Sequence, residues 1–169
     1  SRFMVPSPKV LTYDLAPEMS AYEVTEKLLE AIRGNIYDFI LVNYANPDMV
    51  GHSGNLQSTV KACETVDRCL GRVFREIQLN AGVLLVTADH GNCEQMYDAR
   101  NKSPHTSHTL NPVPFSVVGV DGVSELKNGS LSDIAPTVLD ILNVHIPKDM
   151  SGKSLLRFNK KSDDLDLVL

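Results

Sequence analysis

The chain has 169 residues, of which 43% are hydrophobic and 22% are charged, and its formal net charge at pH 7 is −5. This length is typical of one domain with a substantial core, and the balanced composition excludes a disordered or fibrous chain. The acidic balance disfavours nucleic-acid binding, and no apolar run reaches the ~20 residues of a membrane span. We therefore expect a soluble protein that binds neither nucleic acid nor membrane.

The three cysteines are odd in number and lack the spacing of a metal finger, so they predict no disulfide framework. The N-terminus has no apolar segment followed by a cleavage site, so we expect no signal peptide. Both features favour a cytoplasmic protein. Cys63 lies on the apolar stripe of a predicted helix, where the expected role is a small buried side chain.

Three helices are predicted from apolar residues at helical spacing. The first follows a capping-box pattern at Ser20 and Glu23 and ends at Gly34. The second carries a longer apolar stripe over 60–77. The third begins near Ser132, and the proline that follows falls in its first turn, where a missing N–H is tolerated.

Three short apolar runs, at 39–42, 82–87 and 113–118, predict strands between these helices. The turn residues at 43–48 and the polar stretch at 92–109 predict loops, and a loop of the second length is usually functional. Helices that alternate with buried strands predict an α/β fold, with helices flanking a mostly parallel sheet. Ligands bind such sheets beyond the carboxyl ends of the strands.

Four of the five histidines lie in or beside three polar segments, two of which follow the ends of predicted strands. The first segment contains Asp48 and His52, the second Asp89 and His90, and the third spans 105–108. Each pair alone is common on surface loops, but together they predict a divalent-metal site. Mixed carboxylate and imidazole ligands suit Mn²⁺, Zn²⁺ or Fe²⁺ better than Ca²⁺. The remaining histidine, at position 145, is expected to be an ordinary loop residue.

Four motifs resemble cofactor-independent phosphoglycerate mutases: PSPKVLTYD at 6–14, NYANPDMVGH at 43–52, TADHGN at 87–92 and HTSHT at 105–109. They follow the family's order, and the resemblance covers about residues 5–155. The family belongs to the alkaline-phosphatase superfamily and interconverts 3- and 2-phosphoglycerate with two Mn²⁺ ions. The resemblance therefore implies an isomerase of glycolysis and gluconeogenesis, with an alkaline-phosphatase-like fold.

The resemblance also implies a role for individual residues. Asp48 and His52 match ligands of one metal ion, and a histidine of the HTSHT motif completes the set. We assign that position to His108, with His105 as the alternative.

For the second metal ion, the matching ligands are Asp89 and His90. Lys9 matches a lysine near the transferred phosphate, which makes it the expected catalytic and substrate-binding residue. A cation there offsets developing negative charge. The ions are expected to be Mn²⁺, with Co²⁺, Fe²⁺ or Zn²⁺ as alternatives, because Asp/His sets accept all four.

The chain departs from the family in its extent. In full-length members the nucleophilic serine and another aspartate ligand lie in an N-terminal segment that this sequence lacks, and most substrate-gripping arginines lie in an inserted domain. We expect residues 1–159 to be the C-terminal part of the phosphatase-like metal-binding domain, without its N-terminal strands, and 160–169 to be a tail. The chain alone is expected to be inactive as a mutase and to self-associate through an exposed sheet edge.

Two alternatives stay open. A phosphopentomutase or another phosphotransferase of the same superfamily shares the Asp-His-Gly motif, although residues 46–49 and 94–96 favour the glycerate enzyme. A non-catalytic metal-binding domain would keep the ligands without a nucleophile.

Overall fold

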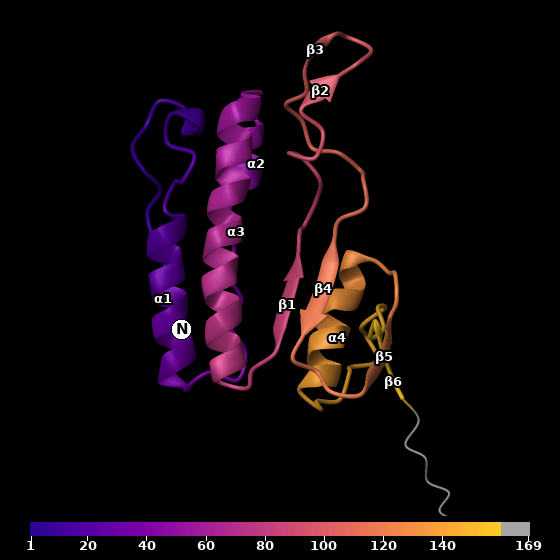
Figure 1. The fold of residues 1–169 in the computed structure, drawn as a ribbon. Helices are drawn as coiled ribbons and strands as arrows, with labels where there is room; N and C mark the ends of the chain where they lie inside the picture. The colour runs from indigo at the N-terminus through magenta and orange to yellow at the C-terminus, as the bar shows by residue number, and fades with distance from the viewer. Residues whose placement is uncertain (160–169) are drawn as a thin grey trace, which may run out of the picture. The chain divides into compact units, whose positions relative to one another are not determined.

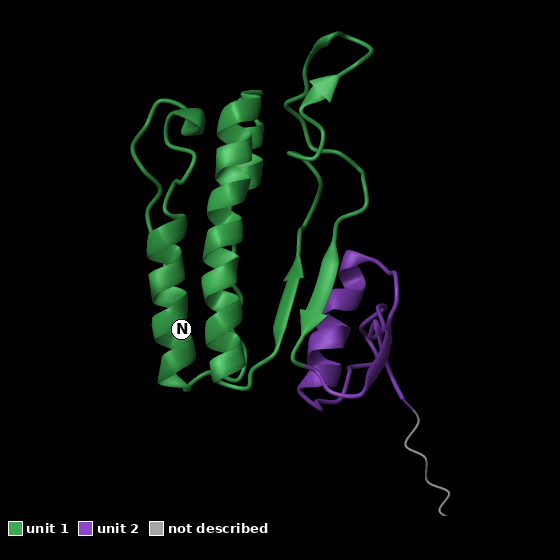
Figure 2. Ribbon diagram, viewed as in Figure 1, with its two compact units in different colours: residues 1–119 green, residues 120–169 purple. Residues whose placement is uncertain are grey.

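The computed structural model, shown as a ribbon in Figure 1, describes residues 1–159. The chain divides into two compact units, and the boundary lies between Gly119 and Val120 (Figure 2). The tail predicted at 160–169 lies outside the described residues. None of the helices in the described part is both long and apolar enough to cross a membrane.

Unit 1 begins with its helical part, which consists of η1 (Tyr13–Leu15), α1 (Ala21–Gly34), α2 (Asn46–Gly51) and α3 (Leu56–Leu79). The predictions of α1 and α3 are confirmed. The two helices lie side by side (Figure 1) because each carries an apolar stripe. Their contact forms the core, to which the following residues contribute: Leu28, Leu29, Ile32, Val73, and the partly buried Ile77 and Leu84.

Two local predictions in this region are wrong. The Ser20 hydroxyl does not cap α1 but donates a hydrogen bond of 2.7 Å to the Pro6 carbonyl. Residues 46–48 are helical rather than loop, because α2 begins at Asn46 and accommodates Pro47 in its first turn. This short helix is what carries Asp48.

The strands of unit 1 form two antiparallel pairs. β1 (Leu84–Thr87) pairs with β4 (Phe115–Val118), and β2 (Tyr97–Asp98) pairs with β3 (Ser103–Pro104). The predicted strands at 82–87 and 113–118 are thus confirmed in type and place. The long polar stretch between them contains the short β2–β3 hairpin and a bridge between Gly91 and Thr109.

The mostly parallel sheet is not present, since every strand pair within residues 1–159 is antiparallel. The run at 39–42, predicted as a buried strand, is not a strand, and Phe39 and Leu41 are 55% and 84% exposed. An apolar run reports a preference for burial, whereas a strand also needs a neighbour for its backbone groups. The sequence therefore identified the tendency of this run to be buried, but it did not show whether another strand pairs with it.

Unit 2 consists of β5 (Val123–Leu126), η2 (Leu131–Asp133), α4 (Ile134–Ile141) and β6 (Leu156–Phe158), with β5 and β6 paired antiparallel. The predicted helix is confirmed, but its cap differs from the prediction at Ser132. Ser130 and Asp133 form a capping box on η2, and Ser130 lies two residues before the predicted cap. Asp133 also accepts the Lys153 backbone N–H at 2.8 Å and so ties the segment before β6 to the start of α4.

Candidate metal centre

The short helix α2 presents two of the predicted ligands together. Asp48 lies in its first turn and His52 is its C-cap residue, four positions later. Residues four apart on a helix lie on the same face. The Nε2 atom of His52 is accordingly 3.1 Å from Oδ1 of Asp48.

The third predicted ligand comes from a segment more than fifty residues away in sequence. Nε2 of His108 lies 3.1 Å from Oδ1 of Asp48 and 3.1 Å from Nε2 of His52. The three atoms therefore form a triangle with equal sides. Neighbouring ligands of an ion bound at about 2.0–2.2 Å are separated by roughly 3 Å, so the triangle has the size of one face of a coordination shell.

The hydrogen bonding of His52 supports a cation at this point. Its Nδ1 lies 2.7 Å from the carbonyl oxygen of Thr106, which can only accept, so Nδ1 carries the proton. In a neutral ring, Nε2 then points a lone pair at the carboxylate of Asp48. Two electron-rich atoms at this distance are stabilised by a cation between them, and a histidine ligand typically donates its other N–H to a carbonyl or carboxylate.

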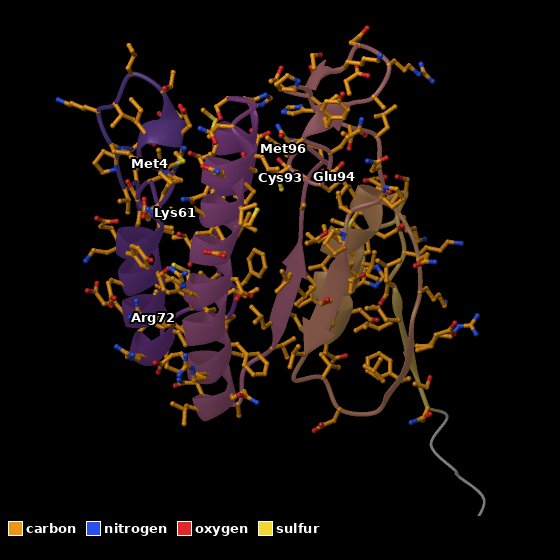
Figure 3. The ribbon with its side chains drawn as sticks, turned by 45° about the horizontal axis from the view of Figure 1, so that its top comes forward. Met4, Lys61, Arg72, Cys93, Glu94 and Met96 are labelled. Carbon is orange, nitrogen blue, oxygen red and sulfur yellow. The ribbon has the colours of Figure 1, made fainter. Side chains whose placement is uncertain are left out.

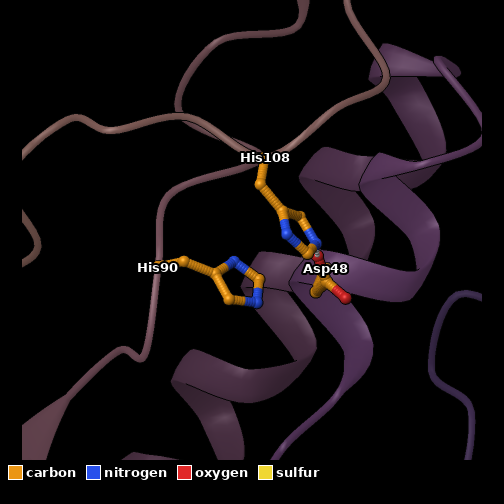
Figure 4. Close-up of side chains that lie close together, drawn as sticks. All are labelled: Asp48, His90 and His108. Carbon is orange, nitrogen blue, oxygen red and sulfur yellow. Dashed lines mark ion pairs between the residues drawn. The ribbon is translucent and has the colours of Figure 1, made fainter.

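His90 approaches the same carboxylate from the segment after β1. Asp48, His90 and His108 each offer a ligand atom, and these atoms lie within 4.8 Å of one another (Figure 4). The rings of His90 and His108 are stacked, with centroids 3.7 Å apart. Asp89, by contrast, has a side chain that is 77% exposed, and its Oδ1 lies 3.6 Å from Nε2 of His90.

Asn92 is a buried residue of this site that the sequence did not identify. Its side-chain amide donates to Oδ1 of Asp48 at 2.8 Å, and the residue is only 5% exposed. Its own Oδ1 is buried without a hydrogen-bond partner and lies against Gly51, where a Cβ atom would collide with it. Asn92 therefore orients the carboxylate, and Gly51 leaves room for it. The available signal was its place directly after Asp-His-Gly.

Glu94 connects the two segments that carry His90 and His108. One carboxylate oxygen accepts the backbone N–H of Asn92 at 2.6 Å, and the other accepts the Thr109 hydroxyl and the Asn111 amide, the latter at 2.9 Å. These hydrogen bonds, that of Thr109 first, lower the pKa of Glu94 below its usual value. The backbone N–H of Thr109 also donates to the carbonyl of Gly91 at 2.9 Å. Figure 3 shows Glu94 in the segment after β1.

The other predicted positions are not among these grouped ligand atoms. His105 is not one of the residues grouped with Asp48, and its buried Nδ1 has no hydrogen-bond partner within the described chain. Lys9 is exposed in the N-terminal segment ahead of η1. His145 is exposed and belongs to unit 2. The geometry thus brings together Asp48, His52, His90 and His108.

Comparison with known proteins identifies a family and relatives of this chain. The profile of the metalloenzyme superfamily matches residues 1–146. The 2,3-bisphosphoglycerate-independent phosphoglycerate mutase of Ehrlichia ruminantium (strain Gardel) is 53% identical over 155 residues, which cover 92% of this chain and 31% of that protein. The enzyme of the same name from Ruegeria pomeroyi is 56% identical over 155 residues, with coverages of 92% and 30%.

A solved structure agrees with these relatives. The chain superposes on the phosphoglycerate mutase of Leishmania mexicana, crystallised at low cobalt concentration, with a TM-score of 0.83 and 32% identity. The match covers 92% of this chain and 31% of that one. The chain thus spans about a third of the length of the proteins it matches, and the resemblance inferred from the four motifs is confirmed.

Proposed function

Because the chain belongs to the metalloenzyme superfamily, we propose that it is a metal-binding part of a cofactor-independent phosphoglycerate mutase. In this proposal, residues 1–159 are the C-terminal part of the phosphatase-like domain. The complete enzyme interconverts 3- and 2-phosphoglycerate in the cytoplasm, within glycolysis and gluconeogenesis. The observation that carries the proposal is the triangle of ligand atoms from Asp48, His52 and His108, with sides of 3.1 Å.

Two metal ions are proposed to act at this centre. Asp48, His52 and His108 hold the first ion, and Asp89 and His90 contribute to the second, with Mn²⁺ as the physiological metal and Co²⁺, Fe²⁺ or Zn²⁺ as substitutes. When bound, such ions neutralise charge on a transferring phosphoryl group and lower the pKa of a coordinated hydroxyl.

The chain's own residues prepare the centre for this chemistry. Asn92 and Thr106 fix the orientations of Asp48 and His52 through the hydrogen bonds described above. The exposed ammonium of Lys9 is proposed to meet the phosphate, where its charge offsets that of the phosphoryl oxygens. The serine nucleophile is proposed to come from outside this chain, so the chain alone is inactive.

The exposed run at 39–42 supports a larger assembly. It lines an apolar hollow of about 660 Å³ together with the N-terminal segment and α1. Phe39 and Leu41 in this run are 55% and 84% exposed, so no neighbour within residues 1–159 covers these apolar side chains. We propose that the rest of the mutase pairs with this run and completes the mostly parallel sheet. In its absence the same surface favours self-association.

Titration calorimetry with MnCl₂ on this chain, beside a mutase assay with 3-phosphoglycerate, tests the proposal. We expect about one tightly bound Mn²⁺ per chain and no turnover. Absence of Mn²⁺ binding in a folded chain would contradict the metal centre. Turnover by the isolated chain would contradict the assignment of the nucleophile to another segment.

A further inference from the structure

Two cysteine thiols face each other beside the metal centre. Sγ of Cys63, on α3, lies 3.7 Å from Sγ of Cys93, three residues after His90. The three cysteines are free thiols, and Cys63 and Cys93 are partly exposed, whereas Cys69 is fully buried. Figure 3 labels Cys93 in the segment that leaves β1. The sequence predicted a small buried side chain at Cys63 and gave no partner for it.

The two sulfur atoms are close enough to form a disulfide after a small movement. A disulfide has an S–S length of about 2.05 Å, so the sulfurs must approach by roughly 1.7 Å, which side-chain rotation and a small shift of the Cys93 segment toward α3 supply together. The hydrogen bond from Cys63 lowers the pKa of Cys93 to about 7, and it raises the pKa of Cys63. Near neutral pH, one sulfur of the pair is therefore available as a thiolate nucleophile.

We propose that Cys63 and Cys93 form a reversible oxidation site, which a low-molecular-weight disulfide converts into an intramolecular disulfide. The Cys93 thiolate attacks one sulfur of the reagent, forms a mixed disulfide and releases the first reagent thiolate. Cys63 then loses its proton to solvent and attacks the sulfur of Cys93, which releases the second reagent thiolate. The two cysteines are oxidised to one disulfide, and the reagent is reduced to two thiols.

Because of the position of Cys93, we expect its oxidation to affect metal binding. Its neighbours in sequence are Asn92, which holds the carboxylate of Asp48, and Glu94, which connects the His90 and His108 segments. A disulfide tethers this segment to α3 and displaces both neighbours. We expect the oxidised chain to bind Mn²⁺ about tenfold more weakly, the size typical when a ligand loses its supporting hydrogen bond. This consequence, unlike the disulfide itself, rests on the proposed metal centre.

The disulfide is tested without any metal. The purified chain is incubated with oxidised glutathione, and free thiols, intact mass and tryptic peptides are measured. We expect the free thiols to fall from the three cysteines of the sequence to one, with no glutathione retained and a peptide pair linked through Cys63 and Cys93. Reduction with dithiothreitol restores all three. Cys69→Ser is the matched control and still forms the link, whereas Cys63→Ser instead retains glutathione on Cys93.

Three results would contradict the proposed disulfide. The chain could keep all three free thiols at a high concentration of oxidised glutathione, or the unmodified chain could retain a stable glutathione adduct. The third result is that disulfides form only between chains. Mn²⁺ calorimetry on the reduced and oxidised chain then separates the two proposals. Equal affinities would refute the coupling to the metal centre. No binding by the reduced chain would refute the proposed function and leave the disulfide result intact.

Discussion

The metal centre and the apolar run at 39–42 differ in how far this chain completes them. At the metal centre, ligand atoms of Asp48, His52 and His108 lie 3.1 Å apart. The Asn92 amide donates to Asp48, and the Thr106 carbonyl accepts from His52. The run at 39–42 has the composition of a buried strand, yet it pairs with no strand within residues 1–159, and Leu41 is 84% exposed. The comparison indicates that the geometry of the candidate ligands is set within this chain, whereas the proposed sheet needs a partner for the run at 39–42.

The largest effect is expected from removing the shared carboxylate. Asp48→Ala leaves the two Nε2 atoms of His52 and His108 without the anionic ligand, so we expect Mn²⁺ affinity to fall by at least about a hundredfold. Calorimetry measures the change. His145→Ala is the control, since it removes an exposed histidine of unit 2. An equal loss of Mn²⁺ affinity in the two variants would show that Asp48 is not a ligand of the metal centre.

The second largest loss of Mn²⁺ affinity is expected from Asn92, which supports a ligand but does not itself bind the metal. Asn92→Ala removes the hydrogen bond to Oδ1 of Asp48, and we expect Mn²⁺ affinity to fall by about 10- to 100-fold. Asn80→Ala, at the exposed end of α3, is the matched control. Thermal unfolding of both apo proteins shows whether folding is retained. Unchanged affinity in a folded Asn92→Ala protein would exclude the orienting role.

Helices and strands whose pattern lies within one segment could be predicted from the sequence. The stripes of α1 and α3 and the apolar runs of β1 and β4 were predicted because their periodicity is set by residues within one element. The candidate ligands were identified because Asp and His residues are concentrated in three polar segments, and their binding of metal stays a prediction. The contacts of Asn92 and Glu94 and the contact between Cys63 and Cys93 were missed, because each depends on where a distant segment lies. The parallel sheet was predicted from alternation, which does not specify pairing.

A third prediction concerns the apolar run. Leu41→Glu places a charge on its most exposed side chain, and we expect self-association of the chain to weaken by several-fold because the apolar contact is lost. Sedimentation equilibrium over a range of concentrations measures this. Leu79→Glu changes a residue that is 81% exposed at the end of α3 and is the control. If the unmodified chain is a monomer at all concentrations, the proposed edge does not associate.

The smallest effect is a change in pH dependence. Because its hydrogen bonds lower the pKa of Glu94, the stability that Glu94 contributes is complete above the ordinary glutamate pKa of about 4.3. It is lost as pH falls through the lowered pKa. In metal-free buffer, urea unfolding should therefore show that Glu94→Gln is less stable than the unmodified chain at pH 6. That gap should narrow toward pH 3, whereas parallel profiles would contradict the connecting role of Glu94.

The most direct test of the metal centre is anomalous X-ray scattering at the manganese edge from crystals of this chain grown with MnCl₂. We expect one strong peak about 2.0–2.3 Å from a carboxylate oxygen of Asp48 and from Nε2 of both His52 and His108. A peak bound elsewhere, with these three side chains free of metal, would contradict the account, as would the absence of any peak at saturating Mn²⁺.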